Sequence, residues 1–579
     1  MSIPKPWCMT PIGGYANSER QVELIASGVL DLGFGPVDIS NGIDWRADPF
    51  STRMWGFRLH NLQWLYNFYS VAHQTGDRFF ADKANSVIAS WVSSSFGVDD
   101  PPPMAWDQHV TALRARVLAC SVAAFEGPFE AVLREHAKVV ADTALAEKPW
   151  NHGTDGLLTL LTIGCALGDD KTIQKTTGRL SETIPVIVDD EGVSNEQSPT
   201  YDYYVYSQLE ELDQMVSACG LEGLPGLERR HLTPEFLAHA TRPDGRWAHL
   251  GDTTPRRVTP IPDTPLEYAL SKGQHGIPPE DTVGTYSRGY VFGRSGWGTH
   301  KEYEQESWYS IRFGPGRQLH GHRDHTSFTW YALGRPLIVD SGFSGYDADE
   351  FREYERSEFA HNQVVVDGLG GYREGTVTIL QARCRGASWE SYLLRDEPYD
   401  RVVRQRSIHI DHDPPLIVVQ DDLVLRRKGF FTTLLHLPAD TIRVESSLEG
   451  YRVELPPEPT SMDVVMIGTD ETDVFQGWSR TGGWIGEGLL DRRESPVIMG
   501  SVRGRRGTLT TVLVPTMGGK TSISRDGRVV EVQSADHQAK IEYDPATGLL
   551  TPVGEDVVSI TISDGRRPIR GWSNRLGIR

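Results

Sequence analysis

The sequence predicts an α+β multidomain protein in which an N-terminal (α/α) toroid, an incomplete barrel, is followed by a C-terminal antiparallel β-sandwich. Up to about residue 240, apolar side chains recur at spacings of three and four residues, as on one face of a helix. From Tyr290 onward, short β-branched and aromatic runs alternate with turn residues, as in antiparallel strands. Helices before strands indicate two segregated units.

The helical half contains a series of amphipathic segments separated by short Gly, Asp or Pro interruptions. Consecutive helix pairs of this kind can curl into a toroid with a groove at one end. The predicted helices are 54–73, 80–94, 108–125, 129–146, 155–167, 171–187, 203–218 and 233–240.

The chain changes character between about 255 and 290, where Pro and polar residues dominate. We therefore expect a helical domain over 1–270 and a β-sandwich domain over 285–579. The predicted strands lie within 290–297, 307–314, 327–334, 336–342, 361–368, 416–425, 430–437, 508–515 and 557–563.

Composition excludes some function classes. The 579-residue chain carries a net charge of −20, which argues against a nucleic-acid binder because such proteins need a basic surface. A local pocket of Arg and His can still bind an acidic ligand inside an acidic protein. No stretch approaches the ~20 apolar residues of a membrane span, and the N-terminus lacks an apolar run of signal-peptide length. These features predict a cytoplasmic protein with no membrane partner.

The number and spacing of the cysteines also favour a cytoplasmic protein. The chain has 5 cysteines at wide spacings and no Cys-x-x-Cys pair. A disulfide framework or a thiolate zinc site is therefore not expected, and reduced thiols are the simplest interpretation.

Two polar clusters in the helical half are candidates for chemistry. Asn151 and His152 stand at the start of a predicted helix, where Asn151 could also serve only as a cap. The loop over 190–200 leads into a segment rich in tyrosine. At helical spacing Tyr201 and Tyr204 share a face, so one can lie in the core and the other in a cleft.

A third cluster lies in the strand-rich half. His320, His322 and His325 fall within six residues, a density that is hard to explain as core packing. On a strand, His320 and His322 project to the same face. Asp340 and His361 are further ligand types, and a His, Asp and His set is chemically suited to zinc. The spacing alone does not show that these side chains meet.

Taken in order, these segments resemble the heparinase II/III group of polysaccharide lyases. The resemblance covers nearly the whole chain, and each piece is weak without the others. It is carried by Ile43-Asp44-Trp45, Thr75-Gly76-Asp77, Asn151-His152, Glu196-x-Ser198-Pro199-x-Tyr201, His320-Gly321-His322-x-Asp324, Val339-Asp340-Ser341-Gly342, Arg356-Ser357, Ala360-His361-Asn362 and Val366-Asp367-Gly368.

The resemblance implies cleavage of a uronic-acid-containing glycan by β-elimination, which leaves an unsaturated uronide. It implies that Asn151 and His152 match the positions that neutralise the substrate carboxylate and supply a base. Tyr201 matches the catalytic tyrosine that protonates the departing O4, and His320 matches a histidine that assists the same chemistry. Whether Tyr201 or His152 takes the C5 proton stays open.

The same resemblance implies that His322, Asp340 and His361 match a metal site. We expect a divalent ion, zinc by preference, that has a structural task and orders the loop carrying His320. The substrate is expected to be an acidic oligosaccharide or polysaccharide. Further candidates for contact with it are Trp45, Arg53, Trp106, Trp150, Asp155, Glu196, Tyr204, Arg323 and Arg356.

Two other functions stay open at this point. A glycoside hydrolase on the same scaffold would need two carboxylates across a groove, and Asp155, Glu191 and Glu196 are available. A non-catalytic glycan-binding or assembly protein would keep aromatic platforms but would not need Asn151, His152, Tyr201 and His320 together. The sequence does not indicate the particular glycan, endo or exo action, or the oligomeric state.

Overall fold

The computed structural model describes residues 18–145, 147–254, 258–367, 371–447, 450–457, 459–477, 482–519, 521–534 and 538–562. The predictions for the N-terminal residues 1–17 and for Gly368 lie outside this part of the chain. Two compact units are present. The helical unit holds the chain up to Glu196 and Asp202–His231, and the β unit holds Gln197–Tyr201 and the chain from Leu232 onward.

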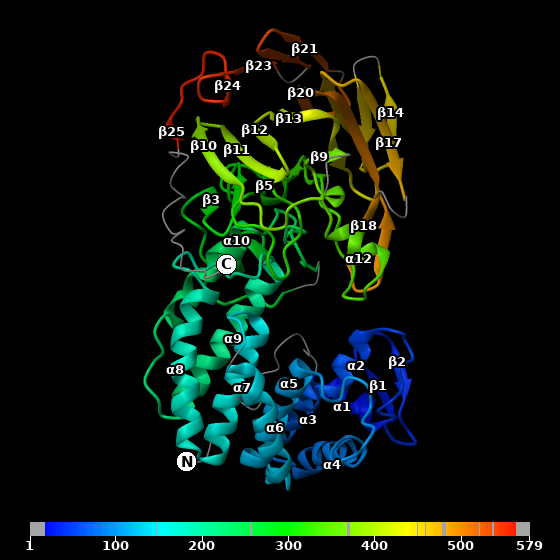
Figure 1. Ribbon diagram of the computed structural model, residues 1–579, viewed down its shortest axis with the longest axis vertical. Helices are drawn as coiled ribbons and strands as arrows, with labels where there is room; N and C mark the ends of the chain where they lie inside the picture. The colour runs from blue at the N-terminus through cyan, green and yellow to red at the C-terminus, as the bar shows by residue number, and fades with distance from the viewer. Residues whose placement is uncertain are drawn as a thin grey trace. The chain divides into compact units, whose positions relative to one another are not determined.

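The helical unit confirms the predicted succession of helices, which pack in consecutive pairs (Figure 1). A short β-hairpin of β1 (Val29–Asp31) and β2 (Pro36–Asp38) lies between the first two helices in the chain. The helices are α1 (Ser18–Ala26), α2 (Arg53–His60), α3 (Tyr66–Thr75), α4 (Arg78–Ser95), α5 (Gln108–Ala124), α6 (Glu130–Ala144), α7 (Asn151–Leu167), α8 (Asp170–Ile187) and α9 (Pro199–Ala218).

Local chemistry explains where these helices begin. The Asp77 side chain accepts from the Phe79 N–H at 2.9 Å, and Asp107 caps α5 in the same way. The predicted helix 54–73 is interrupted, because Leu62 adopts a left-handed conformation with φ of 58°. α2 therefore ends at His60, and α3 begins after a single 3-10 turn.

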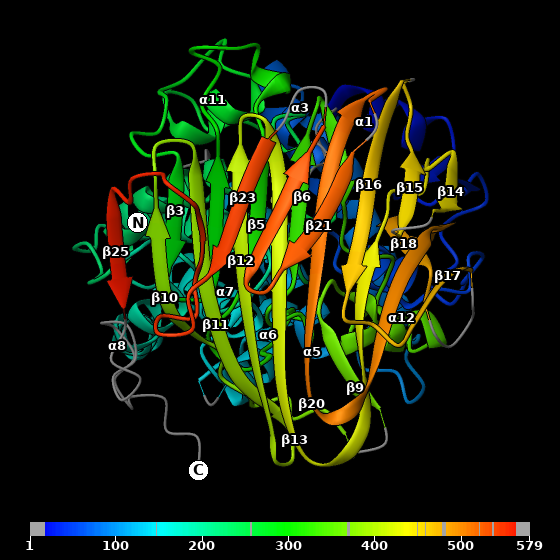
Figure 2. The same cartoon turned by 90° about the horizontal axis from the view of Figure 1, so that it is seen from above.

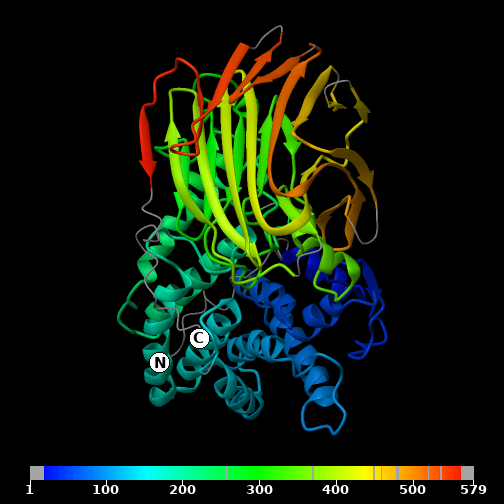
Figure 3. The same cartoon turned by 45° about the horizontal axis from the view of Figure 1, so that its top comes forward.

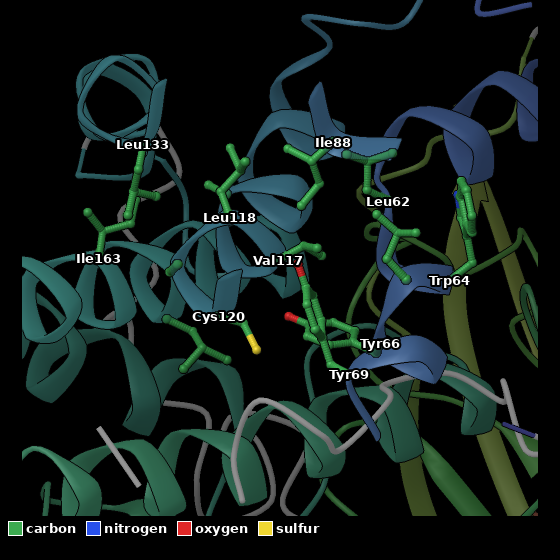
Figure 4. Close-up of a cluster of buried hydrophobic side chains, with 14 of the residues drawn as sticks. Leu62, Trp64, Tyr66, Tyr69, Ile88, Val117, Leu118, Cys120, Leu133 and Ile163 are labelled. Atoms are coloured by element: carbon green, nitrogen blue, oxygen red, sulfur yellow. The ribbon is translucent and has the colours of Figure 1, made fainter. Parts of the chain in front are cut away.

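The core of the helical unit is built from the apolar faces of several helices. Figure 4 shows Val117, Leu118 and Cys120 of α5 among the buried side chains of neighbouring elements. A buried cation also lies in this region, since Arg114 is fully buried and its guanidinium lies 3.9 Å from the Trp91 ring centroid. Arg114 donates to the His60 carbonyl at 2.9 Å and to the His136 ring at 3.0 Å.

We expect the buried His60 to make the helical unit acid-sensitive. Its two ring nitrogens are both bonded, to the Trp45 carbonyl at 3.0 Å and the Trp91 indole at 3.1 Å. Burial, aided by nearby Arg114, lowers the pKa of His60 to about 4. The unfolded chain therefore takes up this proton first, and stability falls as the pH drops from about 6.5 toward 4, by about 3 kcal/mol from this group.

Thermal unfolding between pH 7 and 4.5 checks this prediction. His60→Gln keeps a donor and an acceptor but does not titrate, so its unfolding temperature should fall less steeply with pH than that of the unchanged protein. Identical slopes for the two chains would show that His60 does not carry the effect.

One cysteine prediction is wrong. Cys165 near the end of α7 and Cys219 just beyond α9 form a disulfide, with Cα atoms 6.0 Å apart. The pair is 54 residues apart in sequence, so no short motif could indicate it. Cys120 and Cys384 are buried and take no part in this disulfide.

The β unit confirms the predicted antiparallel strands. A five-stranded meander comprises β3 (Val283–Tyr286), β4 (Tyr290–Arg294), β5 (Trp308–Arg312), β6 (Phe328–Ala332) and β7 (Arg335–Ile338). The large sheet runs in the order β14 (Arg443–Ser446), β15 (Tyr451–Glu454), β16 (Thr460–Ile467), β20 (Pro496–Met517), β13 (Pro415–His436), β12 (Val402–His412), β11 (Trp389–Tyr399), β10 (Ile379–Arg385) and β25 (Ser559–Ile562).

Smaller elements complete the unit. β17 (Glu471–Gln476) pairs with β20, and β9 (Val364–Asp367) pairs with β13. A three-stranded sheet holds β8 (Gly342–Phe343), β18 (Trp484–Gly488) and β19 (Asp491–Glu494). A four-stranded sheet holds β21 (Ser522–Asp526), β22 (Val529–Gln533), β23 (Gln538–Tyr543) and β24 (Leu550–Pro552).

The centre of the large sheet is covered on both faces (Figures 2 and 3). Along β13, Ile417 and Val419 face the five-stranded sheet, whereas Leu416 and Val418 pack under the four-stranded sheet. This explains the continuous apolar run at 416–419, since a strand buried on both faces shows no alternation. The predicted strands 416–425 and 430–437 are thus two parts of one long strand, interrupted by a bulge.

The units divide at a different place from the predicted domain bounds. α10 (Thr233–His239) and α11 (Pro265–Leu270) belong to the β unit, although the change from helix to strand comes later. Their buried side chains Ala238 and Ala269 pack against Trp297 and Tyr303. In the described part of the chain, no helix is long and apolar enough to cross a membrane.

Candidate active site

Tyr201 and His320 lie together in the β unit. Their rings are stacked, with centroids 3.4 Å apart and planes inclined by 8°. The Tyr201 hydroxyl is hydrogen-bonded to the hydroxyl of Tyr346, whose ring meets His320 edge-on at 6.4 Å. Burial, followed by the neighbouring Tyr201 and Asp252, raises the pKa of Tyr346 well above its usual value. Tyr346 therefore stays protonated and can donate to Tyr201.

Gln197 positions the loop that carries His320. Its side-chain oxygen accepts from the Gln318 N–H at 2.6 Å, and its amide donates to the Gly316 carbonyl at 3.1 Å. A Cβ at Gly321 would lie 2.1 Å from that same oxygen. Glycine is thus required between the two histidines, because only a residue without a side chain lets Gln197 reach the loop.

Asp252 joins this loop to a cation. Its backbone N–H donates to the His320 carbonyl at 2.9 Å, and its carboxylate lies 2.9 Å from His322 Nε2. Arg352 of α12 (Glu350–Glu355) makes two bonds to the same carboxylate, at 2.6 and 2.8 Å. Burial favours the neutral acid, but His322 and Arg352 outweigh it and lower the pKa of Asp252 to about 2.

His322, Asp340 and His361 converge as a group that could hold a metal ion. One ligand atom from each lies within 4.8 Å of the others, and all three side chains are buried. His361 Nδ1 is 2.8 Å from Asp340, while His361 Nε2 and His322 Nδ1 are buried without a hydrogen-bond partner in the described structure. Two unpartnered imidazole nitrogens beside a carboxylate fit a zinc ion, which prefers such ligands.

Two buried arginines of β12 hold the segments on either side of this group. Arg404 makes two bonds to Asp396, and Arg406 makes two bonds to Asp421. Their remaining N–H groups bind backbone carbonyls of the histidine loop and of the segment after Ala360. These acceptors are His325 and Val364 for Arg404, and Thr326 and Asn362 for Arg406.

Asn151 and His152 lie in the helical unit, at the first turn of α7. The Asn151 N–H donates to Glu196 at 2.6 Å, and its carbonyl accepts from Gln208 at 2.9 Å. The Asn151 side-chain oxygen is buried and has no hydrogen-bond partner in the described structure. The His152 ring stacks on that of His109 at 3.8 Å and lies 4.2 Å from that of Trp150.

Asp155 is hydrogen-bonded to several members of this cluster. Its carboxylate lies 2.8 Å from His109 and 3.1 Å from Arg116, and it accepts from Tyr204 at 2.7 Å. Burial would raise the pKa of Asp155, but Arg116 and His109 outweigh it and hold the pKa well below its usual range. Glu211, on the other side of Arg116, has a pKa raised to about 7 by burial.

The predicted substrate contacts divide into two groups. Trp45 is 5% exposed and packs in the core, and Asp155 and Glu196 are 0% exposed, so the structure gives these residues packing and anchoring roles. Trp106 is partly buried against Trp91 and His136. Partly or fully accessible side chains remain at Arg53, Trp150, Tyr204, Arg323 and Arg356.

Two of the three cations in that second group are already paired with protein carboxylates. Arg53 pairs with Asp107 at 3.0 Å, and Arg323 pairs with Glu358 at 3.2 Å and Glu374 at 2.8 Å. The Arg356 backbone carbonyl accepts from the Arg323 N–H. A uronide that bound to Arg53 or Arg323 would compete with the existing carboxylate partner.

Sequence reasoning missed three residues that the structure places in these clusters. Tyr346 and Asp252 stand in segments without a motif, and each contacts its partner across a long stretch of chain. His109 follows the helix cap Asp107 and gives no signal of its own. Tyr346, Asp252 and His109 could have been identified only from their contacts in the folded protein, which a single sequence does not reveal.

Comparisons with known proteins agree with this picture. The family described as heparinase II/III-like, C-terminal, matches residues 291–484. A search of curated proteins gave no match. Heparinase III is 15% identical with a TM-score of 0.74, over 92% of this chain and 91% of that one. The heparan sulfate lyase HepC from Pedobacter heparinus is 16% identical with a TM-score of 0.65, over 95% and 90%.

These likenesses confirm the predicted fold class, a helical toroid followed by an antiparallel β-sandwich. The match of residues 291–484 to this family agrees with the resemblance that the sequence suggested for that part of the β unit.

Proposed function

We propose that this protein is a polysaccharide lyase that cleaves a uronic-acid-containing glycan by β-elimination. The match of residues 291–484 to the heparinase II/III-like C-terminal family supports this proposal. Glycosaminoglycans are the substrate class suggested by the heparinase and heparan sulfate lyase that share the fold. The observation that carries the proposal is Tyr201, whose ring stacks on His320 and whose hydroxyl is bonded to that of Tyr346. This arrangement suits proton transfer, which is the main task of an elimination.

The reaction sets three tasks. The carboxylate of the uronide must be neutralised, a base must remove the C5 proton, and an acid must protonate the departing O4. In our proposal the Asn151 amide binds the carboxylate and stabilises the enolate-like charge as it develops. His152, whose ring contacts those of His109 and Trp150, binds the same carboxylate or takes the proton of one C5 epimer.

Tyr201 is the proposed acid. Tyr346 keeps its proton and donates to Tyr201, so it stabilises the phenolate that remains after Tyr201 has protonated O4. The same hydrogen bond lowers the cost of Tyr201 acting as the base in a first step. His320 lies flat against the Tyr201 ring and limits its orientation.

We also propose a zinc ion held by His322, Asp340 and His361. When bound, the ion would supply a fixed charge that holds the two histidines and the carboxylate in one arrangement. His322 and His320 flank Gly321, so ordering His322 also orders the backbone of His320. Asp252 fits this task because it binds His322 Nε2 and leaves Nδ1 for the metal.

Asp252→Asn tests this metal site without an activity assay. We expect zinc affinity to fall by roughly 10–100-fold, because an amide orients the His322 ring less firmly and leaves it less basic. Competition with a chromogenic chelator measures the affinity. Asp463→Asn, which removes a carboxylate from the Arg452 pair elsewhere in the β unit, should leave the affinity unchanged. Equal zinc affinity in the two variants would show that Asp252 does not orient His322 for metal binding.

A glycoside hydrolase is the second candidate, and the geometry counts against it. Hydrolysis needs two accessible carboxylates, roughly 5–10 Å apart. Of the three candidate carboxylates, Asp155 and Glu196 are fully buried and bonded to protein groups, and only Glu191 is partly exposed. A protein that only binds glycans would not need the stacked Tyr201 and His320 pair, so this alternative is also less well supported.

Ultraviolet absorbance of the products decides between these functions. Incubation with defined heparan-type, chondroitin-type and alginate-type oligosaccharides should give a near-ultraviolet signal from the unsaturated uronide of at least one substrate. New reducing ends without that absorbance would establish hydrolysis. Neither signal across the whole panel, in a zinc-loaded protein, would favour glycan binding alone.

A further inference from the structure

A patch of exposed cations lies where the two long strands of the large sheet bend. Lys428 of β13 and Arg503, Arg505 and Arg506 of β20 are all exposed. We call these four residues the basic bulge. None of them forms an ion pair with a carboxylate in the described structure, in contrast to Arg53 and Arg323.

The geometry of the strand pair brings these cations together. Val424 pairs with Arg506 and Gly429 with Gly504, so residues 425–428 of β13 face Arg505 alone. Such an excess of residues on one strand is a bulge, which bends the strand and increases its local twist. Figure 2 shows β13 and β20 turning at the same end of the sandwich.

A rigid apolar layer supports the basic bulge. Leu425, Phe431, Val502 and Leu509 are buried in one cluster beneath it. A Cβ at Gly507 would lie 1.8 Å from the Phe431 ring, so glycine is required where β20 crosses that ring. The cations are therefore held on a fixed base, which reduces the entropy that a ligand must overcome on binding.

An exposed aromatic ring completes the patch. Phe430 is 42% exposed and pairs with Arg503, whose guanidinium lies 5.2 Å from the ring centroid. An apolar face beside cations suits a ligand with a sugar ring and an acidic group, since the ring can pack on Phe430 while the acid meets arginine. A bare phosphate would use only the cations.

The surrounding charge makes the patch more specific. The whole chain carries a net charge of −20, so a polyanion meets repulsion over most of the surface. Asp470, which accepts from the Arg503 N–H at 2.7 Å, and Glu471 and Asp473 on β17 limit the patch on one side. A polyanion can therefore gain affinity at the basic bulge while the acidic surroundings disfavour other contacts.

We propose that the basic bulge binds acidic glycan chains at a site separate from the Tyr201 and His320 pair. β9 leads from His361 toward the patch, and Asp367 at its end pairs with Phe430. The six residue steps from His361 to Asp367 span at most about 20 Å. Glycan is favoured as the ligand by the proposed function, on which this choice of class rests, and by the exposed Phe430.

Binding of the full-length Tyr201→Phe chain to immobilised heparin and to immobilised alginate tests the proposal, because this variant should not degrade either polymer. The triple variant Arg503→Glu, Arg505→Glu and Arg506→Glu should bind roughly 10–100-fold more weakly at low salt, with a smaller dependence on salt concentration. The control variant Arg443→Glu, Arg493→Glu and Lys540→Glu makes the same charge change at other exposed sites and should lose less than threefold.

Phe430→Ala separates a glycan site from a simple cation patch. We expect a loss of a few-fold for alginate that persists at high salt, because ring packing is not screened. Equal losses in the two triple variants would reduce the effect to overall charge and overturn the proposal. Stronger binding to anionic phospholipid vesicles or to duplex DNA than to either glycan would overturn the choice of ligand.

Failure of the proposed function gives a different result. In that case no unsaturated product forms from short oligosaccharides, yet the binding measurements still report on the basic bulge. Conversely, the triple variant should cleave short oligosaccharides at the normal rate. A loss of that activity together with binding would mean that the bulge is not a separate site.

Discussion

Tyr201→Phe should lower turnover by roughly 10²–10⁴-fold, the usual contribution of a general acid or base. The substitution removes one hydroxyl and leaves the ring stacked on His320. Substrate affinity should change little, because the proton is transferred only as the reaction proceeds. Product absorbance under single-turnover conditions measures the rate, and equilibrium binding of a short oligosaccharide measures the affinity.

Two neighbouring tyrosines sharpen this test. Tyr203→Phe, on the same helix, should keep normal turnover. Tyr346→Phe should keep part of it, and its pH profile should shift toward higher pH, because the phenolate of Tyr201 loses a hydrogen-bond donor. Normal turnover in Tyr201→Phe would reject the assigned acid, whatever the other two variants do.

Arg406→Met should destabilise the β unit by about 3–5 kcal/mol, since it leaves the Asp421 carboxylate buried without its cation. Arg406 is 1% exposed, and its two bonds to Asp421 measure 2.6 and 2.9 Å. The loss also removes the donors to the carbonyls of Thr326 and Asn362, which flank the proposed metal ligands. Denaturant unfolding measures the free energy.

Two further variants provide controls for this prediction, one at the buried partner Asp421 and one at an exposed ion pair. Adding Asp421→Asn to Arg406→Met should restore part of the loss, because the orphaned charge is then gone. Arg443→Met breaks an exposed pair with Glu454 and should cost less than about 1 kcal/mol. A loss at Arg406 no larger than that at Arg443 would show that the buried pair does not stabilise the unit.

The succession of elements could be predicted from sequence because helix and strand periodicities are local. The three-layer arrangement could not, since it depends on which face of β13 meets which sheet. The interruption of the 54–73 helix depends on Leu62, which adopts a left-handed conformation. Leucine rarely adopts this conformation, so the residue type does not predict it. The disulfide was missed because its cysteines meet only after α7 and α9 have packed.

The candidate site shows the same division. His322, Asp340 and His361 were identified from residue type and resemblance, and the structure places them together. Tyr346, Asp252 and Arg352 are common residue types, and their significance lies in what they touch. Asp155, predicted as a substrate contact, is buried and bonded to Arg116.

The bond between Cys165 and Cys219 has a consequence for how the chain responds to cleavage. The segment between these cysteines contains α8 and the whole of α9, which includes Tyr201. A single cut by a protease in the connection between α8 and α9 would leave both pieces covalently joined. Such a nicked chain would migrate as one species on a non-reducing gel and as two after reduction.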